Sequence, residues 1–310
     1  MRHLSRRLSQ IVPTMLAALV LVFLVMRVLP GDPAISLLGT AATPEAVAVL
    51  RRELGVDRPL PEQFGAYLAG VLRLDLGQSL ALRAPVTLLV TDAMPHTLLL
   101  TLGGTLVAAA IGVPLGTAAA LRRGTWLDYA ASTGALLGVS APVFVSGLLL
   151  LLAFSLHWRV FPTAGAGATP AEVLRALVLP SIATGLFLAG VVSRITRASV
   201  LQMLGQDYAR TARAKGLAEA AVIGRHVLRN AIIPILTVIG LNVGTLLSGA
   251  VVAETVFTRP GLGRLALEAI LARDYPVIQG VVLVSSFAVL LLNLLVDLLY
   301  GVADPRVRGT

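Results

Sequence analysis

The stretch from Asp207 to Pro234, DYARTARAKGLAEAAVIGRHVLRNAIIP, is strongly charged and lies between two long apolar runs. Its pattern is helical rather than loop-like, because Tyr208, Ala212 and Lys215 share one face at helical spacing. Gly216 stands where a glycine would end such a helix. We expect the rest of the chain to be organised around this stretch.

A second short helix is predicted from Leu217 to Leu228, with Leu217, Ala221 and Leu228 directed inward and Arg225 outward. Two interpretations of the resulting basic hairpin stay open. It suits a rigid element on which a partner docks. Alternatively, its arginines merely fix the orientation of the chain in a membrane.

Composition identifies the class of protein. The chain has 310 residues, of which 56% are hydrophobic and 13% charged, a balance that no water-soluble fold of this size normally has. It contains no cysteine, which excludes disulfides, thiolate metal sites and a cysteine nucleophile. The formal charge of +9 could suggest nucleic acid, but the distribution of charge across the membrane argues against a nucleic-acid partner.

Six stretches are apolar enough to span a bilayer, which takes roughly 20 residues each. They are Ile11–Leu29, His96–Leu121, Thr133–Leu156, Ala176–Val192, Ala231–Val252 and Val277–Val296. An even number of spans places both termini on one side. That side carries 14 basic residues and four acids, whereas the other carries 11 of each, so the first side is predicted to be cytoplasmic.

The segment from Gly31 to Pro95 is far longer than an ordinary connection between spans. Thr43 is a good N-cap for a helix that Gly55 ends. A second helix is expected from about Pro61 to Leu72, burying Phe64, Tyr67, Leu68 and Val71. A small helical insert on the outer face is therefore predicted, either to receive a partner or to brace the structure.

A second outer segment, Ala253–Gly280, follows the fifth span. Charges this close to the membrane core should face protein or water, so we expect Glu254, Arg259, Arg264 and Asp274 to pair at the outer mouth. A tight turn is predicted at Pro260, Gly261 and Gly263, before a helix from about Leu265 to Ala272. The candidate outer-face or gate residues are Glu254, Arg259, Pro260, Gly261, Gly263 and Asp274.

Motifs for chemistry are missing. Lys215, the lone lysine, is followed by Gly216 and not by Ser or Thr, so a phosphate-binding loop of the Walker type is excluded. The four histidines lie apart rather than at ligand spacing. Ionisable residues are also absent from the centres of the predicted spans, which argues against an ion-coupled carrier.

Several stretches match a known family in order along the chain. They are RVLPGDPA (Arg27–Ala34), DLGQS (Asp75–Ser79), MPHTLLLT (Met94–Thr101), DYARTARAKGL (Asp207–Leu217), RHVLRNAIIP (Arg225–Pro234) and ETVFTRPGLGRLALEAILARDYPVIQG (Glu254–Gly280). Over nearly its whole length the chain resembles the permease subunit of binding-protein-dependent ABC importers of the dipeptide, oligopeptide and nickel group, specifically the first of two paired permeases.

The resemblance implies an all-α, six-helix type I ABC importer permease fold with a small helical extracytoplasmic insert. The corresponding divisions are an N-terminal tail and first span (1–30), the insert (31–95), a five-helix core (96–303) that includes a coupling loop (205–230), and a cytoplasmic tail (304–310). It also implies a multi-pass protein of a prokaryotic cell membrane with both termini in the cytoplasm.

In that family the cytoplasmic EAA loop is a coupling helix that fits a groove of the ATPase subunit. Its EAA positions correspond to Arg210, Thr211 and Ala212, and its glycine to Gly216; the first position departs from the usual Glu. The implied ATPase-coupling residues are Asp207, Tyr208, Arg210, Thr211, Ala212, Arg213, Lys215, Gly216 and Glu219.

The implied partners are a second permease subunit, two ATPase subunits, an extracytoplasmic solute-binding protein and the lipid bilayer. The chain itself would bind no cofactor and hydrolyse nothing, because ATP and Mg belong to the ATPase subunits. Peptides are the expected cargo, with nickel or another small solute as the alternative. Two other classes stay open: an intramembrane enzyme, for which no nucleophile and base are paired, and a carrier that works without ATPases.

Overall fold

The computed structural model describes residues 2–28, 35, 38 and 42–303. Within these residues the protein is helical, and its one extended pairing is an isolated antiparallel bridge between Gln78 and Pro85. The predicted all-α fold is confirmed. Most of the RVLPGDPA stretch and the predicted tail 304–310 lie outside the described residues.

The chain divides into two compact units. Unit 1 comprises the residues up to His96 together with Pro260–Leu291, and unit 2 comprises Thr97–Arg259 together with the chain from Leu292 onward. Two long helices contribute residues to both units.

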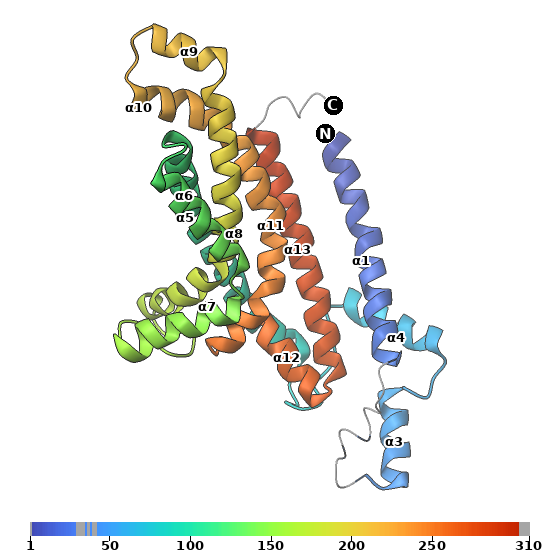
Figure 1. The fold of residues 1–310 in the computed structure, drawn as a ribbon. Coiled ribbons are helices and arrows are strands. Elements are labelled where there is room, and N and C mark those ends of the chain that lie inside the picture. The colour runs from blue at the N-terminus through green and yellow to red at the C-terminus, as the bar shows by residue number, and fades with distance from the viewer. Residues whose placement is uncertain (1, 29–34, 36–37, 39–41, 304–310) are drawn as a thin grey trace. The chain divides into compact units, whose positions relative to one another are not determined.

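Unit 1 contains the N-terminal helices and the last outer segment. Its helices are α1 (Arg2–Val28), α3 (Pro44–Leu54), α4 (Leu60–Leu72), the first part of α5 (Val86–Leu121), α12 (Leu262–Ala272) and most of α13 (Tyr275–Ala303) (Figure 1). The α5, α12 and α13 segments share an apolar core. Its buried side chains include Val86, Val90, Leu262, Val277 and Val281.

The helices predicted between Gly31 and Pro95 are present. The backbone N–H of Ala46 donates to the Thr43 hydroxyl at 3.2 Å, and Gly55 ends α3 with a φ of +65°. On α4, Phe64 and Tyr67 pack against Phe23 of α1, with ring centroids 5.2 and 6.1 Å from that ring. The predicted apolar face of α4 is therefore the face that makes contacts, although its side chains are half-buried.

Unit 2 is a bundle around α8. Its helices, besides the later part of α5 and the end of α13, are α6 (Trp126–Ser140), α7 (Val143–Leu150), the π-helix η2 (Leu151–His157), α8 (Pro170–Leu204), α9 (Asp207–Ala214), α10 (Glu219–Ala221), the π-helix η3 (Val222–Val227) and α11 (Leu228–Val256). In the most apolar 18-residue stretch of α8, 67% of the residues are buried. The value for the Glu219–Val256 segment, which contains α11, is 33%. This burial makes α8 the central helix of the unit.

Small residues bring α8 against its neighbours. A Cβ added at Gly190 of α8 would overlap the Ala135 carbonyl of α6, and one added at Gly116 of α5 would overlap the Ser193 carbonyl of α8. Any larger residue would force these helices apart, so glycine is required for the close packing of α8 against α5 and α6.

The chain spans a membrane. By length and composition, α5, α8, the Glu219–Val256 segment and the Tyr275–Val296 part of α13 can each cross a bilayer, and α6 with α7 and η2 makes a fifth span if counted as one. The apolar part of α1, Val12–Val25, is shorter than these. The predicted count of six spans stays a prediction.

The predicted third span, Thr133–Leu156, is not one rod. It consists of two helical segments that meet at an angle of 105°. Pro142 causes the break, because it has no N–H to donate and holds Ala141 in an extended conformation with ψ of 119°.

The helix that contains the fourth span is longer than the span predicted from the sequence. Thr169 and Glu172 form a capping box, but the helix that they start continues through Pro180 to Leu204 as α8. The predicted span Ala176–Val192 therefore lies within a helix that begins six residues earlier, at Pro170.

Candidate functional site

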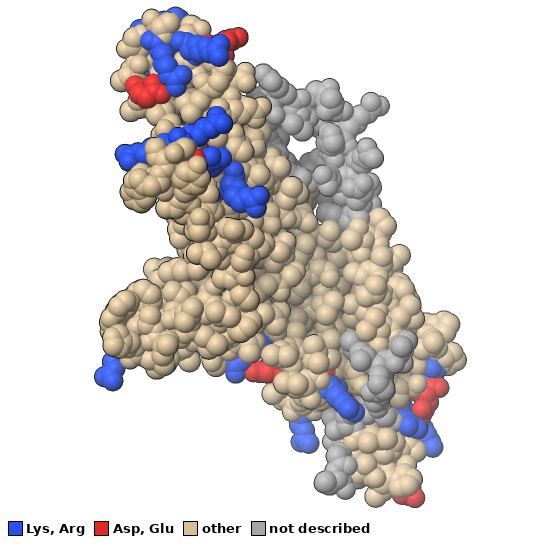
Figure 2. Space-filling model, in the orientation of Figure 1, with Lys and Arg blue, Asp and Glu red and all other residues tan. Residues whose placement is uncertain are grey.

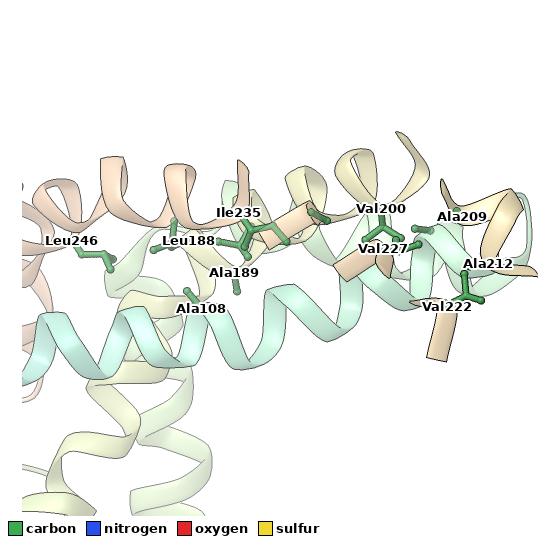
Figure 3. Packing of buried hydrophobic residues seen from close by; sticks show 13 residues of the cluster. Ala108, Leu188, Ala189, Val200, Ala209, Ala212, Val222, Val227, Ile235 and Leu246 are labelled. Carbon is green, nitrogen blue, oxygen red and sulfur yellow. The ribbon is translucent and has the colours of Figure 1, made fainter. Parts of the chain in front are cut away.

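The basic hairpin lies at one end of unit 2, where α9 and α10 extend beyond the ends of α5 and α6 (Figure 1). Its helix α9 packs by small side chains. Ala209 and Ala212 are buried and lie beside Val227 and Val222 of the returning chain, with Val200 of α8 in the same cluster (Figure 3). The hairpin is thus an extension of the unit 2 core and not a loose loop.

Gly216 ends α9 as the sequence predicts. Its φ is +79°, a conformation in which any other residue is strained. The N–H of Leu217 donates to the Ala212 carbonyl at 3.3 Å, and the N–H of Gly216 donates to the Arg213 carbonyl at 2.9 Å. These two bonds form a Schellman motif, which fixes the direction in which the chain leaves the helix.

An ion pair closes the hairpin. The Arg213 guanidinium donates to both Glu219 carboxylate oxygens, from Nε at 3.0 Å and from Nη2 at 2.8 Å. This hydrogen bonding raises the pKa of Arg213 above its usual range. The two residues lie on opposite sides of the Gly216 turn, so the pair holds the two arms of the hairpin together.

The returning arm differs from the prediction. In place of one helix from Leu217 to Leu228, a single turn of α10 passes into the π-helix η3 and then into α11. Leu217 is 43% exposed, so its predicted inward position is wrong, and Val222 and Val227 provide the buried contacts instead. The wider π-turn changes which residues face inward, a shift that helical periodicity in the sequence does not indicate.

Most of the predicted coupling residues lie on the surface of the hairpin. Ala212 is buried, whereas Lys215 is exposed and Tyr208 is 37% exposed, so these three residues do not form one buried face. Burial raises the pKa of the Tyr208 phenol, against the effect of a hydrogen bond with Asn230. The exposed members of the predicted set are Asp207, Tyr208, Arg210, Thr211, Arg213, Lys215, Gly216 and Glu219. Lys and Arg side chains dominate this end in Figure 2.

Two of the predicted outer-mouth residues lie in unit 2, where the buried Arg259 guanidinium has no hydrogen-bond partner among the described residues. Glu254 and Arg259 are both fully buried, and the Thr97 hydroxyl lies 2.5 Å from a Glu254 carboxylate oxygen. The backbone N–H of Arg259 donates to the backbone carbonyl of Glu254 at 2.8 Å, across a turn in which Thr258 has a φ of +52°. Burial lowers the pKa of Arg259, and the negative charge of Glu254 opposes that effect.

The other two outer-mouth charges have different partners, both within unit 1. Arg264 pairs with Glu268 at 2.7 Å, one helical turn away on α12. Asp274 accepts hydrogen bonds from the Ser79 hydroxyl at 2.5 Å and from the Ala81 N–H at 3.0 Å. Asp274 therefore bonds to neutral groups, and its predicted pairing with the other three charges is wrong.

The turn predicted at Pro260, Gly261 and Gly263 is shifted. Gly261 is the N-cap of α12, and the helix begins at Leu262, so Gly263 lies inside it and is buried. The sharp reversal of the chain falls earlier, at Thr258.

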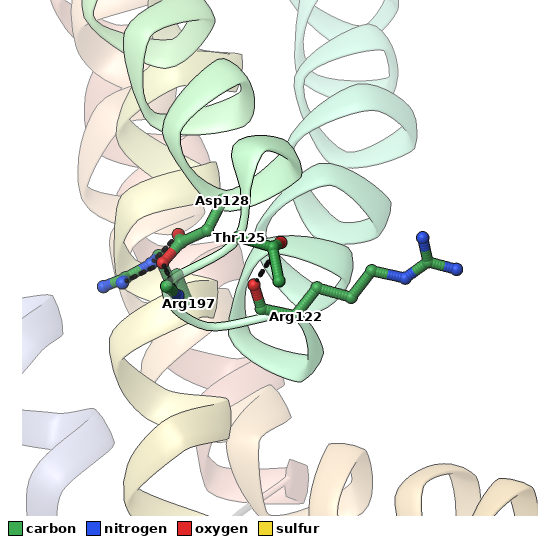
Figure 4. A network of polar contacts seen from close by, with 5 residues as sticks. Arg122, Thr125, Asp128 and Arg197 are labelled. Carbon is green, nitrogen blue, oxygen red and sulfur yellow. Dashed lines mark hydrogen bonds and ion pairs between the residues drawn. The ribbon is translucent and has the colours of Figure 1, made fainter.

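One ion pair of unit 2 was not anticipated. Asp128, in the first turn of α6, accepts from Arg197 of α8 through both oxygens, at 2.6 Å from Nε and 2.8 Å from Nη2 (Figure 4). It also accepts from the Gly124 N–H at 3.0 Å. Spacing gave no signal for this contact because the partners are far apart in the sequence.

Among the residues that the structure describes, no three His, Cys, Asp or Glu side chains are placed to hold a metal ion. What the hairpin offers is charge and shape. Its exposed cations can contact acidic groups of a partner, and its packed base can transmit a displacement to α8 and α11.

Comparison with known proteins agrees with these features. Residues 112–309 match the family described as "Binding-protein-dependent transport system inner membrane component", and residues 1–101 match "Binding-prot-dependent transport system membrane comp, N-term". The dipeptide transport system permease protein DppB of Escherichia coli (strain K12) is 40% identical over 335 residues, with 99% of each chain covered. The glutathione transport system permease protein GsiC of Salmonella choleraesuis (strain SC-B67) is 42% identical, also with 99% of each chain covered.

A solved structure shares the fold. A chain of the MetNI methionine ABC transporter, in an inward-facing conformation, superimposes with a TM-score of 0.58 at 16% identity. The alignment covers 70% of this chain and 96% of that chain. The helices have the arrangement of an ABC importer permease, as the sequence predicts.

Proposed function

Because the chain belongs to the family of binding-protein-dependent transport system inner membrane components, we propose that it is the permease subunit of an ATP-driven importer of di- or oligopeptides. Full-length similarity to permeases named for dipeptide and for glutathione transport supports a peptide cargo. Import of nickel or another small solute is the alternative.

The observation that carries the proposal is the construction of the hairpin. Its tip is basic and exposed, whereas its base is continuous with the buried cluster that runs along α8 and α11. A partner that moves the tip therefore moves the two helices together. We infer that α9 docks on an ATPase subunit and that closure of the ATPases is converted into movement of the unit 2 helices.

The proposed complex contains a second permease, two ATPase subunits and an extracytoplasmic solute-binding protein. ATP and Mg bind to the ATPase subunits, and the chain itself holds no cofactor. The hairpin and both chain termini face the cytoplasm in this proposal, because the basic residues gather at the hairpin end.

The buried Glu254 and Arg259 are proposed to belong to an outer gate. Both side chains are inaccessible. Glu254 lies in the last turn of α11 and Arg259 follows the helix, whose other end carries the hairpin. Movement of α11 would therefore change the position of both charges. The roles of Pro260, Gly261, Gly263 and Asp274 at the outer face are proposals of the same kind.

Affinity purification of the full-length tagged chain from its native membrane tests the assembly. We expect the second permease and the ATPase subunits to co-purify, and expect the double charge reversal Arg210→Glu with Lys215→Glu to lose the ATPases alone. The matched control is Arg58→Glu with Arg73→Glu, two exposed arginines that are not part of the hairpin. If the hairpin variant retains as much ATPase as the wild type, the docking site is refuted. If the wild-type chain purifies alone, the protein is a carrier that works without ATPases.

Transport assays test the cargo. We expect cells that carry the complete importer to accumulate a labelled dipeptide and to lose that uptake when the gene for this chain is deleted. Accumulation of nickel, with no competition from dipeptides, would favour the alternative cargo and leave the permease assignment intact.

A further inference from the structure

A second basic cluster lies at the turn between α5 and α6. Arg122 and Arg123 occupy the turn, and Arg194 of α8 is exposed about one helical turn before Arg197, which binds Asp128 at the start of α6. The position of Arg194 follows from the contacts on each side of it, since Gly190 meets Ala135 of α6 and Arg197 meets Asp128 at the start of α6. We call Arg122, Arg123 and Arg194 the turn cluster.

The turn cluster has an uncompensated positive charge. Asp128 is the nearby acid, and its two oxygens are taken by Arg197 and by the Gly124 N–H. Among the described residues, no ion pair joins Arg122, Arg123 or Arg194 to a carboxylate. In Figure 4 the Arg122 side chain extends away from Asp128 and Arg197.

Exposed aromatic side chains adjoin the cluster. Trp126 and Tyr129 are 74% and 69% exposed, and they lie one helical turn apart on the same face of α6. Leu121, the last residue of the apolar helix α5, is 42% exposed. Trp and Tyr at the end of an apolar helix are typical of the headgroup layer, where the ring contacts lipid and its polar atom contacts water.

The hairpin lacks this arrangement. It projects beyond the ends of α5 and α6, its one aromatic residue is Tyr208, and Arg213 is neutralised by Glu219 (Figure 1). The turn cluster therefore lies at the level at which the membrane-crossing helices end, whereas the hairpin lies further out. At the ends of the membrane-crossing helices, the anionic group that is present to complement these arginines is the phosphate of a lipid headgroup.

We propose that the turn cluster, with Trp126 and Tyr129 beside it, binds the headgroup of an anionic phospholipid such as phosphatidylglycerol. The planar guanidinium groups match the oxygens of a phosphodiester, and the net negative charge of the lipid offsets arginines that have no acid of their own. The proposal depends on the membrane position of α5 and α6, and not on the cargo or the ATPases.

Native mass spectrometry of the full-length chain, solubilised with equimolar phosphatidylglycerol and phosphatidylcholine, tests the proposal. We expect the wild type to retain phosphatidylglycerol preferentially. The triple variant Arg122→Gln, Arg123→Gln, Arg194→Gln should lower that preference by more than about tenfold. The matched control Arg210→Gln, Arg225→Gln, Arg229→Gln removes the same charge from the hairpin and should keep the wild-type preference.

Three results would overturn the proposal. The first is equal preference for phosphatidylglycerol in the triple variant and the wild type. The second is release of the lipid by inorganic phosphate, which would indicate a site for free anions. The third is loss of the ATPase subunits from the triple variant with its lipid preference unchanged, which would indicate a protein-docking surface. Should the triple variant not fold, the single variant Arg122→Gln, whose side chain points away from the protein contacts, should lower the preference about fivefold, and an unchanged preference would again refute the site.

Discussion

Two turns at the same end of unit 2 use the same ion-pair chemistry for different purposes. Between α5 and α6, Asp128 binds Arg197 in a distant helix, and the Asp128 side chain is 6% exposed. In the hairpin, Arg213 binds Glu219 just across the turn, and the Glu219 side chain is 55% exposed. The first pair ties two helices of the bundle together, whereas the second stiffens a projecting element.

The comparison shows that burial and sequence separation decide what an ion pair does. An exposed local pair is screened by water and salt and contributes little to stability. A pair in which one member is buried cannot lose its partner without leaving an unpaired charge out of water. The α5–α6 turn should therefore be sensitive to its carboxylate, and the hairpin should depend more on its backbone turn.

The largest effect is expected at Gly216. Gly216→Val places a β-branched residue at a φ of +79°, at a cost of about 2 kcal/mol, which corresponds to a roughly 30-fold shift away from the native turn. Uptake by the reconstituted importer should fall by about tenfold or more while the chain still inserts into the membrane. The control Gly224→Val also adds its side chain in open space but at an ordinary φ, and it should transport normally. Equal loss in both variants would show that bulk, not turn geometry, is responsible.

A smaller effect is expected from Asp128→Asn. Loss of the carboxylate removes the charge-assisted bonds by which Asp128 joins α6 to Arg197 of α8, and the melting temperature of the purified chain should fall by roughly 5 °C. The control Asp207→Asn makes the same change at an acid whose side chain is 99% exposed, and should leave the melting temperature unchanged. Similar melting temperatures for the two variants would contradict the distinction between the two turns.

The smallest effect is expected from Glu219→Gln. The pair with Arg213 is exposed, and the Schellman bonds at Gly216 remain, so uptake should fall by no more than about twofold. The wild-type rate should also decrease slightly as salt is raised, because salt screens this pair. A loss as great as that of Gly216→Val would mean that the ion pair, and not the backbone turn, maintains the hairpin.

The sequence predicts features that depend on neighbouring residues. Thr43, Gly55 and Gly216 act as caps because a helix end is specified by the few residues around it. The apolar face of α4 and the all-helical fold follow equally from local spacing. Family motifs add the position of the hairpin as a candidate coupling site, whose role remains a prediction.

Features that depend on distant contacts are not predictable in this way. Asp128 finds Arg197, and Asp274 finds Ser79, only when helices that are far apart in sequence come together. The 105° break at Pro142 illustrates a different limit. A proline can end a helix, bend it or lie within it, as Pro180 lies within α8. The packing around the proline decides which of these outcomes occurs.

The length of α8 has a mechanical consequence. At 35 residues it is roughly 50 Å long, whereas the apolar layer of a bilayer is about 30 Å thick, so some 20 Å is shared between its two ends. Because α9 follows its last turn directly, a tilt of about 10° around one end would carry the hairpin sideways by roughly 9 Å. A sideways displacement of the hairpin by several ångströms would then require only a small rotation of α8 inside the bilayer. The helices of the bundle would need to change few of their contacts to allow it.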